Sequence, residues 1–505
     1  MKSVRRMTIA VGTLLSAVSC AGAREAVLSP PTAVSPGRGT AVIPASPIAS
    51  PRLGIQAPRI PDRVCPLTDH GARGDGTTND TAAINQAIAA CHRAGGGTVR
   101  FPPGNYRAAS IRLLSRIRLQ LEAGARLQAL EEGYEPPEPN PFDKYQDFGH
   151  SHFRNSLIWG EGVTDVAIEG PGQIEGRALR SGNARAGQGN KQIAIKGGVR
   201  LAFRNLTQVG GGHFFYLLTD CRHLTMEKLQ LERGRDGIDL VGCSQVSLRD
   251  LRITGCGDDT IALKSDFSTG KRLVSEDVDV QDSVVESGCN GLQFGSETAG
   301  DFRRVRFRNI EVLRAGKAAI GVQTNDGGTI EDVLFENITI RRAANPIFVN
   351  TTRRLRTPET VTPGRVRNLV IRNVTATEIV QSHDAEPANA ATISGLPERP
   401  HENILLENVS ILYKGGGTPE DAAAVPPYPT NYNPRKLGTR PAYGFFVRHV
   451  RGLTFRKVRV GFEAPDHRPA FATIDVTGLA YEGVQAQRPG DTSPRPWPVP
   501  ATAAQ

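Results

Sequence analysis

Residues 224–263 read LTMEKLQLERGRDGIDLVGCSQVSLRDLRITGCGDDTIAL and contain one short pattern twice. The pattern is an apolar residue, any residue, a polar turn residue and a second apolar residue. It occurs at Met226-Glu227-Lys228-Leu229 and, 22 positions later, at Leu248-Arg249-Asp250-Leu251. Self-similarity of this kind is typical of a repeat architecture. Outward from this stretch the pattern recurs at Phe203-Arg204-Asn205-Leu206, Phe307-Arg308-Asn309-Ile310, Phe335-Glu336-Asn337-Ile338, Ile371-Arg372-Asn373-Val374 and Leu406-Glu407-Asn408-Val409.

Each repeat contains two or three short alternating runs separated by glycine or polar residues, which predicts an all-β coil of parallel strands. One coil of such a structure buries its inward side chains only by stacking on the next coil. The asparagine at the same turn of successive coils can hydrogen-bond to its own backbone and to its stacked equivalents. We therefore interpret Asn337 and Asn373 as turn residues, although both also match glycosylation sequons.

The two ends of the chain differ from the repeats. Residues 1–23 resemble an export signal with a basic start, an apolar stretch and a small-residue cleavage site. An imperfect lipoprotein box is the alternative, with a lipid anchor at Cys20. Residues 24–60 and 486–505, rich in proline and small residues, are predicted to be a disordered linker and tail around a β-helix domain at 61–485. We therefore expect a secreted or periplasmic protein, or a lipoprotein on the cell envelope.

A helix is predicted where the repeats begin. Asp80-Thr81 is a plausible start, Gly95-Gly96-Gly97 a plausible end, and the apolar residues between them share one helical face. Such a helix can cap the open end of a strand stack. The repeat register places Cys221 on Cys243 and Cys256 on Cys289, either as disulfides or as a ladder of small residues.

Net charge narrows the class of partner. The formal charge is +10 and the pI about 9.4, which favours polyanions. No basic arm or base-reading motif is present, so a nucleic-acid binder is not expected. No stretch after the export signal is long and apolar enough to span a membrane. We expect a monomer.

Three aspartates mark the candidate chemistry. The repeat register puts Asp236, Asp259 and Asn290 in one column just before an inward strand, with Asp258 beside Asp259. Stacked strands are about 4.8 Å apart, so these carboxylates would be close neighbours. The non-functional alternative is that these aspartates only form turns. Clustered carboxylates raise one another's pKa, however, and glycoside hydrolysis needs a carboxylic acid and a carboxylate side by side.

Four segments resemble glycoside hydrolase family 28, the polygalacturonase-like enzymes. They are 69–81, 155–162, Arg235-Asp236-Gly237-Ile238-Asp239, where the family has Asn-Thr-Asp-Gly-Ile-Asp, and Gly257-Asp258-Asp259-Thr260-Ile261-Ala262-Leu263-Lys264-Ser265. The resemblance implies a single-stranded right-handed parallel β-helix of the pectin lyase-like class that cleaves pectic polysaccharide with inversion. It implies Asp258 as general acid, Asp236 and Asp259 as the groups that position and deprotonate water, and no metal or cofactor.

Two departures from the family bear on the substrate. The family's Gly-His-Gly falls at Cys289-Asn290-Gly291, and its Arg-Ile-Lys falls at Gly321-Val322-Gln323. The resemblance assigns those lost cations to a galacturonate carboxylate, which favours rhamnogalacturonan or branched pectin over homogalacturonan. The expected substrate-binding residues are Asn290, Gln323, Lys264, Arg235 and His213.

Two other functions remain open on the sequence. A polysaccharide lyase of the same fold would use Ca²⁺ held by carboxylates and a basic side chain as base. A non-catalytic carbohydrate-binding β-helix would explain the lost cations but not the three retained aspartates.

Overall fold

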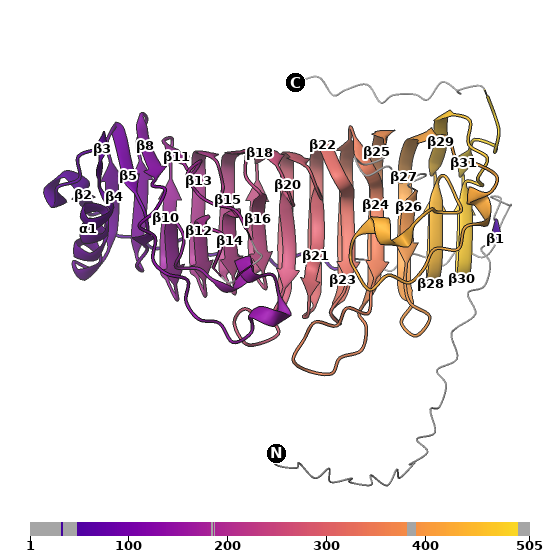
Figure 1. The fold of residues 1–505 in the computed structure, drawn as a ribbon, viewed down its shortest axis with the longest axis horizontal. Helices are drawn as coiled ribbons and strands as arrows, with labels where there is room; N and C mark the ends of the chain where they lie inside the picture. Colours follow the sequence, from indigo (N-terminus) through magenta and orange to yellow (C-terminus); the bar gives the residue numbers. More distant parts are fainter. Residues whose placement is uncertain (1–31, 34–47, 183–184, 186, 381–389, 493–505) are drawn as a thin grey trace, which may run out of the picture.

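The structure, a computed structural model, describes residues 32–33, 48–182, 185, 187–380 and 390–492. Its strands stack into one elongated coil, with the capping helix at one end (Figure 1). Strands one coil apart pair in parallel throughout the stack, so three long parallel sheets run along the axis. The predicted signal at 1–23 and the tail from 493 onward lie outside the described residues.

The first sheet contains β2 (Val64–Pro66), β4 (Gly97–Phe101), β7 (Ile117–Leu121), β10 (Thr164–Glu169) and β17 (Ser244–Arg249). The second contains β3 (Asp75–Asn79), β5 (Gly104–Ala108), β8 (Ala125–Ala129), β11 (Gln173–Glu175), β18 (Arg252–Cys256), β29 (Arg459–Ala464) and β31 (Gln485–Ala486). Strands that bend from the first sheet into the second are β13 (Val199–Val209), β15 (Arg222–Glu232), β20 (Ser275–Ser287), β23 (Thr329–Ile340), β25 (Arg365–Ile379) and β27 (His401–Gly415).

The third sheet carries the candidate chemistry. It contains β6 (Ile111–Arg112), β9 (Ile158–Glu161), β12 (Lys191–Lys196), β14 (Phe214–Thr219), β16 (Asp236–Val241), β19 (Ile261–Ser265), β21 (Leu292–Thr298), β24 (Ala343–Thr351) and β26 (Ala391–Ser394). Three long strands also contribute to it, namely β22 (Phe302–Thr324), β28 (Phe445–Arg456) and β30 (Phe471–Glu482). The short strand β1 (Thr32–Ala33) pairs antiparallel with β30.

Inward side chains of successive coils form the core. Ile238 pairs with Ile261, Ile261 with Leu292, and Leu292 with Ile320, and all four side chains are fully buried. Full burial of an aliphatic side chain of this size stabilises the fold by about 1.5–3 kcal/mol. The column is the one that the repeat register predicts, so the predicted coil of parallel strands is confirmed.

Polar turns between the first and second sheets form a ladder on the outside of the coil. Each of Asn309, Asn337, Asn373 and Asn408 has a φ of 53–56°, in the left-handed region that asparagine tolerates. The side-chain amide of each later asparagine donates to the amide oxygen of the one before, at 2.8–2.9 Å. These contacts are the stacked turn bonds that the sequence predicts.

Helix α1 (Thr81–Arg93) covers the first coil, as predicted, and buries Ile84, Ile88 and Cys91 against it. Cys91 forms a disulfide with Cys65, a pairing that the repeat register did not predict because neither residue lies in a repeat. The four cysteines of the repeats are buried free thiols. Cys221 does lie on Cys243.

The predicted stacking of Cys256 on Cys289 is wrong. Cys256 pairs with Ser287, two positions before Cys289, because the coil-to-coil offset here is 31 positions, the same offset that pairs Ile261 with Leu292. Cys289 consequently lies one coil beyond Asp258, at the candidate site.

Residues 48–60, which the sequence assigns to the spacer, have no regular secondary structure but lie along the coil. The amide of Arg52 donates to Asp277 and the amide of Arg59 donates to Asp165, each at 2.8 Å. Over this part the structure differs from the expected free linker, because turn carboxylates on the outside of the coil accept its backbone bonds. Among the described residues, no helix has the length and apolarity that a membrane crossing requires.

Loops that connect the second sheet to the third, or leave the third, are longer than the other turns and gather along one side of the coil (Figure 1). They include 130–157, 176–182, 266–274, 352–364 and 416–444. Short 3-10 helices occur within them at η2 (Asp143–Tyr145), η3 (Phe148–Ser151), η4 (Asp421–Ala423) and η5 (Pro434–Leu437), whereas η1 (Leu67–His70) lies at the capped end against α1.

Candidate active site

The three aspartates meet where the chain turns from the second sheet into the third. The amide of Gly237 donates to the carbonyl of Asp259 at 2.8 Å, and that of Thr260 donates to the carbonyl of Asn290 at 3.1 Å. These bonds put Asp236, Asp259 and Asn290 in one column, as the repeat register predicts. Asp236 and Asp259 are buried, whereas the side chain of Asp258 is 30% exposed beside them.

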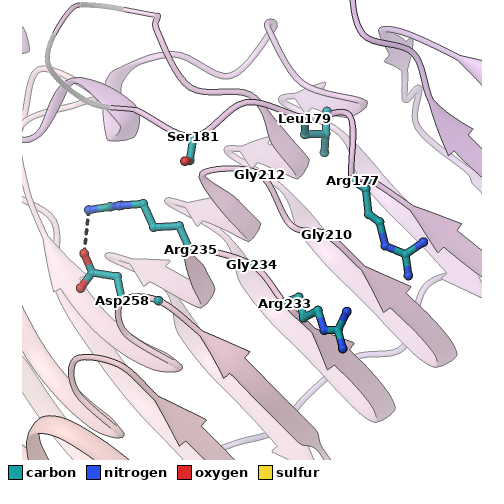
Figure 2. A pocket seen from close by; sticks show the side chains of 11 residues that line it. Arg177, Leu179, Ser181, Gly210, Gly212, Arg233, Gly234, Arg235 and Asp258 are labelled. Carbon is teal, nitrogen blue, oxygen red and sulfur yellow. Dashed lines mark hydrogen bonds and ion pairs between the residues drawn. The ribbon is translucent and has the colours of Figure 1, made fainter.

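Arg235 bridges two of the carboxylates. Its guanidinium lies 2.8 Å from Asp258 Oδ2 and 3.1 Å from Asp236 Oδ1. Figure 2 shows Arg235 reaching across to Asp258. Burial raises the pKa of Asp258, but Arg235, aided by Cys289, Lys317 and Lys264, outweighs it and holds that pKa below its usual range. Asp258 is thus ionised in the free site.

The other two carboxyl groups behave in the opposite way. Burial, followed by repulsion from Asp258, raises the pKa of Asp259 to about 6. The same two causes raise the pKa of Asp236 well above its ordinary value. The amide of Asn290 donates to Asp259 Oδ1 at 2.7 Å, which favours the ionised form and moderates the shift. The two buried carboxyl groups therefore hold their protons to higher pH than Asp258 does.

A second layer of charge lies beneath Asp236. Lys264 is 4% exposed, and its Nζ lies 2.7 Å from Asp239 Oδ2 and 3.9 Å from Asp236 Oδ2. His150, from the loop 130–157, covers this lysine with its Nε2 3.3 Å from Nζ. Glu297 Oε2 lies 3.9 Å from the same Nζ. Burial opposes the lysine charge, but Asp239, Glu297 and Asp236 outweigh it and raise the pKa of Lys264.

Lys264 and His213, which the sequence predicts as substrate-binding residues, are buried. Lys264 lies below the carboxylates instead of on the groove surface, because it points from β19 into the layer that His150 covers. His213 is also fully buried, and its Nε2 lies 3.0 Å from Arg235 while the amide of Gly182 donates to its Nδ1 at 3.0 Å. Burial and the Arg235 charge lower the pKa of His213, so its ring is neutral and lies against Arg235.

The positions of the family's lost cations, beyond Asp259, hold buried uncharged residues. A Cβ atom at Gly321 would lie 1.9 Å from Gln293 Oε1, so the Gln293 side chain fills the space in which an arginine would begin. Gln323 is fully buried, and neither polar atom of its side chain has a hydrogen-bond partner among the described residues. The geometry thus agrees with the departures seen in the sequence.

Several charged residues near the site had no signal in the repeats. Lys317 follows Cys289 in the Asp258 column, and its ammonium group lies 5.6 Å from the ring centre of Tyr432. Arg354 and Arg356, from the loop 352–364, pair with Asp326 and Glu297. For Arg354 and Arg356, only their position in a long loop could have suggested a role, since binding residues concentrate in loops.

One set of possible metal ligands lies in the site. Oxygen atoms of Asp258 and Asp259 and the Cys289 Sγ are within 4.8 Å of one another. Calcium takes six to eight oxygen ligands, which two carboxylates and a thiol do not supply. Asp258 is also already paired with the Arg235 guanidinium. This donor set does not fit the calcium site that a lyase would need.

A pocket of about 640 Å³ opens beside Asp258, toward the lower-numbered coils. Asp258 and Arg235 form one side of it, while Arg177 and Arg233 lie at the other (Figure 2). Its remaining lining consists of Gly176, Leu179, Ser181, Gly210, Gly212, Gly234 and Gly257.

Comparison with known proteins agrees with this geometry. The family model of glycosyl hydrolases family 28 matches residues 142–428, more than half of the chain. The chain belongs to this family. A second model, described as rhamnogalacturonase A/epimerase, pectate lyase-like, matches residues 66–122. A probable polygalacturonase of Vitis vinifera is 23% identical over 368 residues, which cover 68% of this chain and 73% of that protein.

Two solved structures of family 28 enzymes resemble this one. The exopolygalacturonase of Thermotoga maritima has a TM-score of 0.61 at 18% identity, covering 81% of this chain and 94% of that chain. The family 28 exopolygalacturonase of Yersinia enterocolitica has a TM-score of 0.61 at 16% identity, covering 86% and 80%. The likeness confirms the predicted right-handed parallel β-helix.

Proposed function

We propose that this family 28 protein hydrolyses glycosidic bonds of pectic polysaccharide with Asp236, Asp258 and Asp259 as its catalytic residues. The observation that carries the proposal is the convergence of three carboxyl groups in two protonation regimes. Asp258 is partly exposed and has a lowered pKa, whereas Asp236 and Asp259 are buried with raised pKa values. Environments that separate the pKa values of neighbouring carboxyl groups are typical of acid–base pairs. In the free site the separation is opposite to the proposed roles, since the acid Asp258 is the ionised group, so the reaction requires substrate binding to reverse it.

In the proposed reaction, Asp258 gives its proton to the glycosidic oxygen as the bond to the anomeric carbon breaks. A water molecule attacks that carbon from the opposite face and loses a proton to Asp236 or Asp259. Asp258 thus becomes a carboxylate and the base becomes a carboxylic acid. Transfer of a proton from the base back to Asp258, through solvent, restores the starting state. This is single displacement with inversion.

The Arg235 contact imposes a condition on this reaction. Arg235 keeps Asp258 ionised in the free site, whereas the acid role requires a proton there. A substrate group that draws the guanidinium away removes the main cation from Asp258. Burial and the neighbouring carboxyl groups then favour the protonated form. Substrate binding would in this way prepare the general acid.

The surface beyond Asp259 bears on the sugar sequence. Gly321 and Gln323 provide no charge there, and Gln293 fills the space above Gly321. A carboxylated sugar is poorly matched to such a surface. We propose rhamnogalacturonan or another branched pectic fragment, with a neutral sugar on this side of the cleaved bond, as the substrate.

Product analysis tests the reaction class. The wild-type protein is incubated with homogalacturonan, rhamnogalacturonan and debranched fragments, and new reducing ends and ultraviolet absorbance are followed together. Hydrolysis releases reducing ends without an ultraviolet-absorbing product, and NMR of the first-formed product shows the inverted anomer. An absorbing unsaturated sugar would instead establish a lyase. Binding of a glycan without any product would establish a carbohydrate-binding protein.

We also propose that the protein acts outside the cytoplasm as a monomer. The disulfide between Cys65 and Cys91 supports export, since structural disulfides persist in oxidising compartments. Mass spectrometry of the mature protein tests both forms of export. Cleavage near residue 23 is expected for a soluble form, and an acylated Cys20 for the lipoprotein form. An unprocessed N-terminus would contradict export.

A further inference from the structure

The pocket beside Asp258 has a floor made of glycine backbone. Most of these glycines have a structural reason. Gly210 and Gly212 have φ values of +72° and +63°, and a Cβ atom at Gly234 would lie 2.6 Å from the ring of Phe215. A Cβ atom at Gly176 would lie 2.2 Å from the carbonyl of Gly210. Packing or backbone conformation therefore explains glycine at these four positions.

Gly257 has neither reason. Its φ lies outside the left-handed region, and a Cβ atom there would meet only the carbonyl of Gly234, at 3.8 Å. A side chain at this position would project into the pocket without disturbing the coil. Glycine without a packing or conformational cause marks a place where a ligand approaches the backbone. The space above Gly257, next to Asp258, is thus suited to a sugar ring at the cleaved bond.

The far rim of the pocket carries two arginines. The side chains of Arg177 and Arg233 are 64% and 73% exposed, and they lie 2.6 Å and 3.3 Å from Glu175 and Glu232. Glu232 is 53% exposed, whereas the Glu175 side chain is only 9% exposed, and a guanidinium has five donors of which these contacts use few. Both arginines therefore have donors left to bind a further carboxylate.

The charge on the two sides of Asp258 is consequently unequal. The pocket is lined by three arginines and one carboxylate, Asp258 itself. On the other side, Gly321 and Gln323 are uncharged and buried, Arg354 and Arg356 are held by the buried carboxylates of Asp326 and Glu297, and Lys317 lies against Tyr432, whereas the guanidinium groups of the two rim arginines remain largely exposed. An acidic sugar fits the first side and a neutral sugar fits the second.

We propose that this pocket binds a uronate residue whose carboxylate is held by Arg177 and Arg233, and that the cleaved bond joins this uronate to a neutral sugar. The inference rests on the proposed function and makes its substrate specific. It also explains how an acidic polysaccharide is recognised without the family's lost arginine and lysine. Arg235 lies between the rim and Asp258, so an anion in the pocket also competes for the guanidinium that pairs with Asp258.

Kinetics with matched substrates test the pocket. The protein variants are the double change Arg177→Gln/Arg233→Gln, the single change Gly257→Ala, and Arg249→Gln as control. Arg249 is an exposed arginine paired with Glu227 at 2.8 Å that does not line the pocket. The substrates are an oligosaccharide of alternating galacturonate and rhamnose and the same oligosaccharide with its carboxyl groups reduced to alcohols.

The double variant is expected to raise KM for the acidic oligosaccharide about tenfold, equivalent to about 1.4 kcal/mol, and to leave KM for the reduced one unchanged. Gly257→Ala is expected to raise KM for both, and Arg249→Gln for neither. Equal effects of the double variant on both oligosaccharides would overturn the uronate assignment. An unchanged KM in Gly257→Ala would overturn the pocket itself.

Calorimetric binding of the acidic oligosaccharide to Asp258→Asn protein, with and without the arginine changes, separates the two proposals. Binding that depends on both arginines, in a protein whose wild type releases no product, would keep the pocket and refute hydrolysis. Product release with arginine-independent binding would keep hydrolysis and refute the pocket.

Discussion

Replacing Lys264 by methionine removes a lysine charge from the buried layer beneath Asp236 and leaves the Asp239 carboxylate without its 2.7 Å partner. Methionine has nearly the same length, so the main effect is electrostatic. Removing one partner of a buried pair costs about 3–5 kcal/mol, because the other charge stays buried and uncompensated. We therefore expect Lys264→Met to lower the free energy of unfolding by about this amount at neutral pH.

The loss should depend on pH with a definite sign. Burial already raises the pKa of Asp239 in the folded protein, and Lys264 opposes that rise. Without the lysine, the folded state binds a proton at Asp239 more tightly than the unfolded state does. Stability from that proton is present at low pH and is lost as pH rises through the folded pKa. Lys264→Met is thus expected to be less damaging at pH 5 than at pH 7.5.

Urea denaturation at both pH values measures the effect, with the linear dependence on denaturant giving the free energy. The double variant Lys264→Met/Asp239→Asn is the matched control, since it removes both charges and should recover most of the lost stability. A cost below about 1 kcal/mol, as for an exposed ion pair, would refute the buried-network reasoning. So would a double variant that is no more stable than Lys264→Met.

Three further predictions concern the ladder, the resting site and the cap. Asn373→Ala should lower the free energy of unfolding by about 2–3 kcal/mol in urea denaturation, because alanine disfavours the left-handed φ and the ladder hydrogen bonds are lost. Asn373→Gly should cost less, since glycine tolerates this φ, and equal costs for the two variants would contradict the contribution of the left-handed φ. Arg235→Gln should move the alkaline limb of the kcat/KM–pH profile, which reports the free enzyme, to higher pH, because the pKa of Asp258 rises when its main cation is removed; an unmoved limb would contradict the bridge. Reducing the disulfide of Cys65 and Cys91 should lower stability by about 3 kcal/mol in thermal unfolding, and no change in Tm would contradict its role in the cap.

Much of the fold could be predicted because each repeat carries the same short pattern of apolar and turn residues. The column Ile238, Ile261, Leu292 and Ile320 follows from spacing alone, since parallel coils stack equivalent positions. The same register correctly brought Asp236 and Asp259 together. The predicted pair of Cys256 and Cys289 was wrong, because it needs an offset of 33 positions, whereas the offset of 31 that pairs Ile261 with Leu292 also pairs Cys256 with Ser287.

The site beyond the carboxylates could not be predicted in the same way. His150 reaches Lys264 from a loop more than one hundred positions earlier in the chain. Arg356 reaches Glu297 from another loop. Loops without periodicity do not reveal where they fold back. Lys264 therefore looked like a groove cation, although the strand turns it into a layer that the loop covers.

The central claim is that Asp258 is the general acid of a three-carboxylate hydrolytic site. The most direct measurement is kcat for Asp258→Asn on the best pectic substrate, with Asp250→Asn, an aspartate at an exposed turn of the same coil, as the control. We expect kcat to fall about 10²–10⁴-fold in Asp258→Asn, with glycan affinity and Tm retained, and to stay unchanged in Asp250→Asn. A kcat for Asp258→Asn within a few-fold of the wild type would contradict the claim.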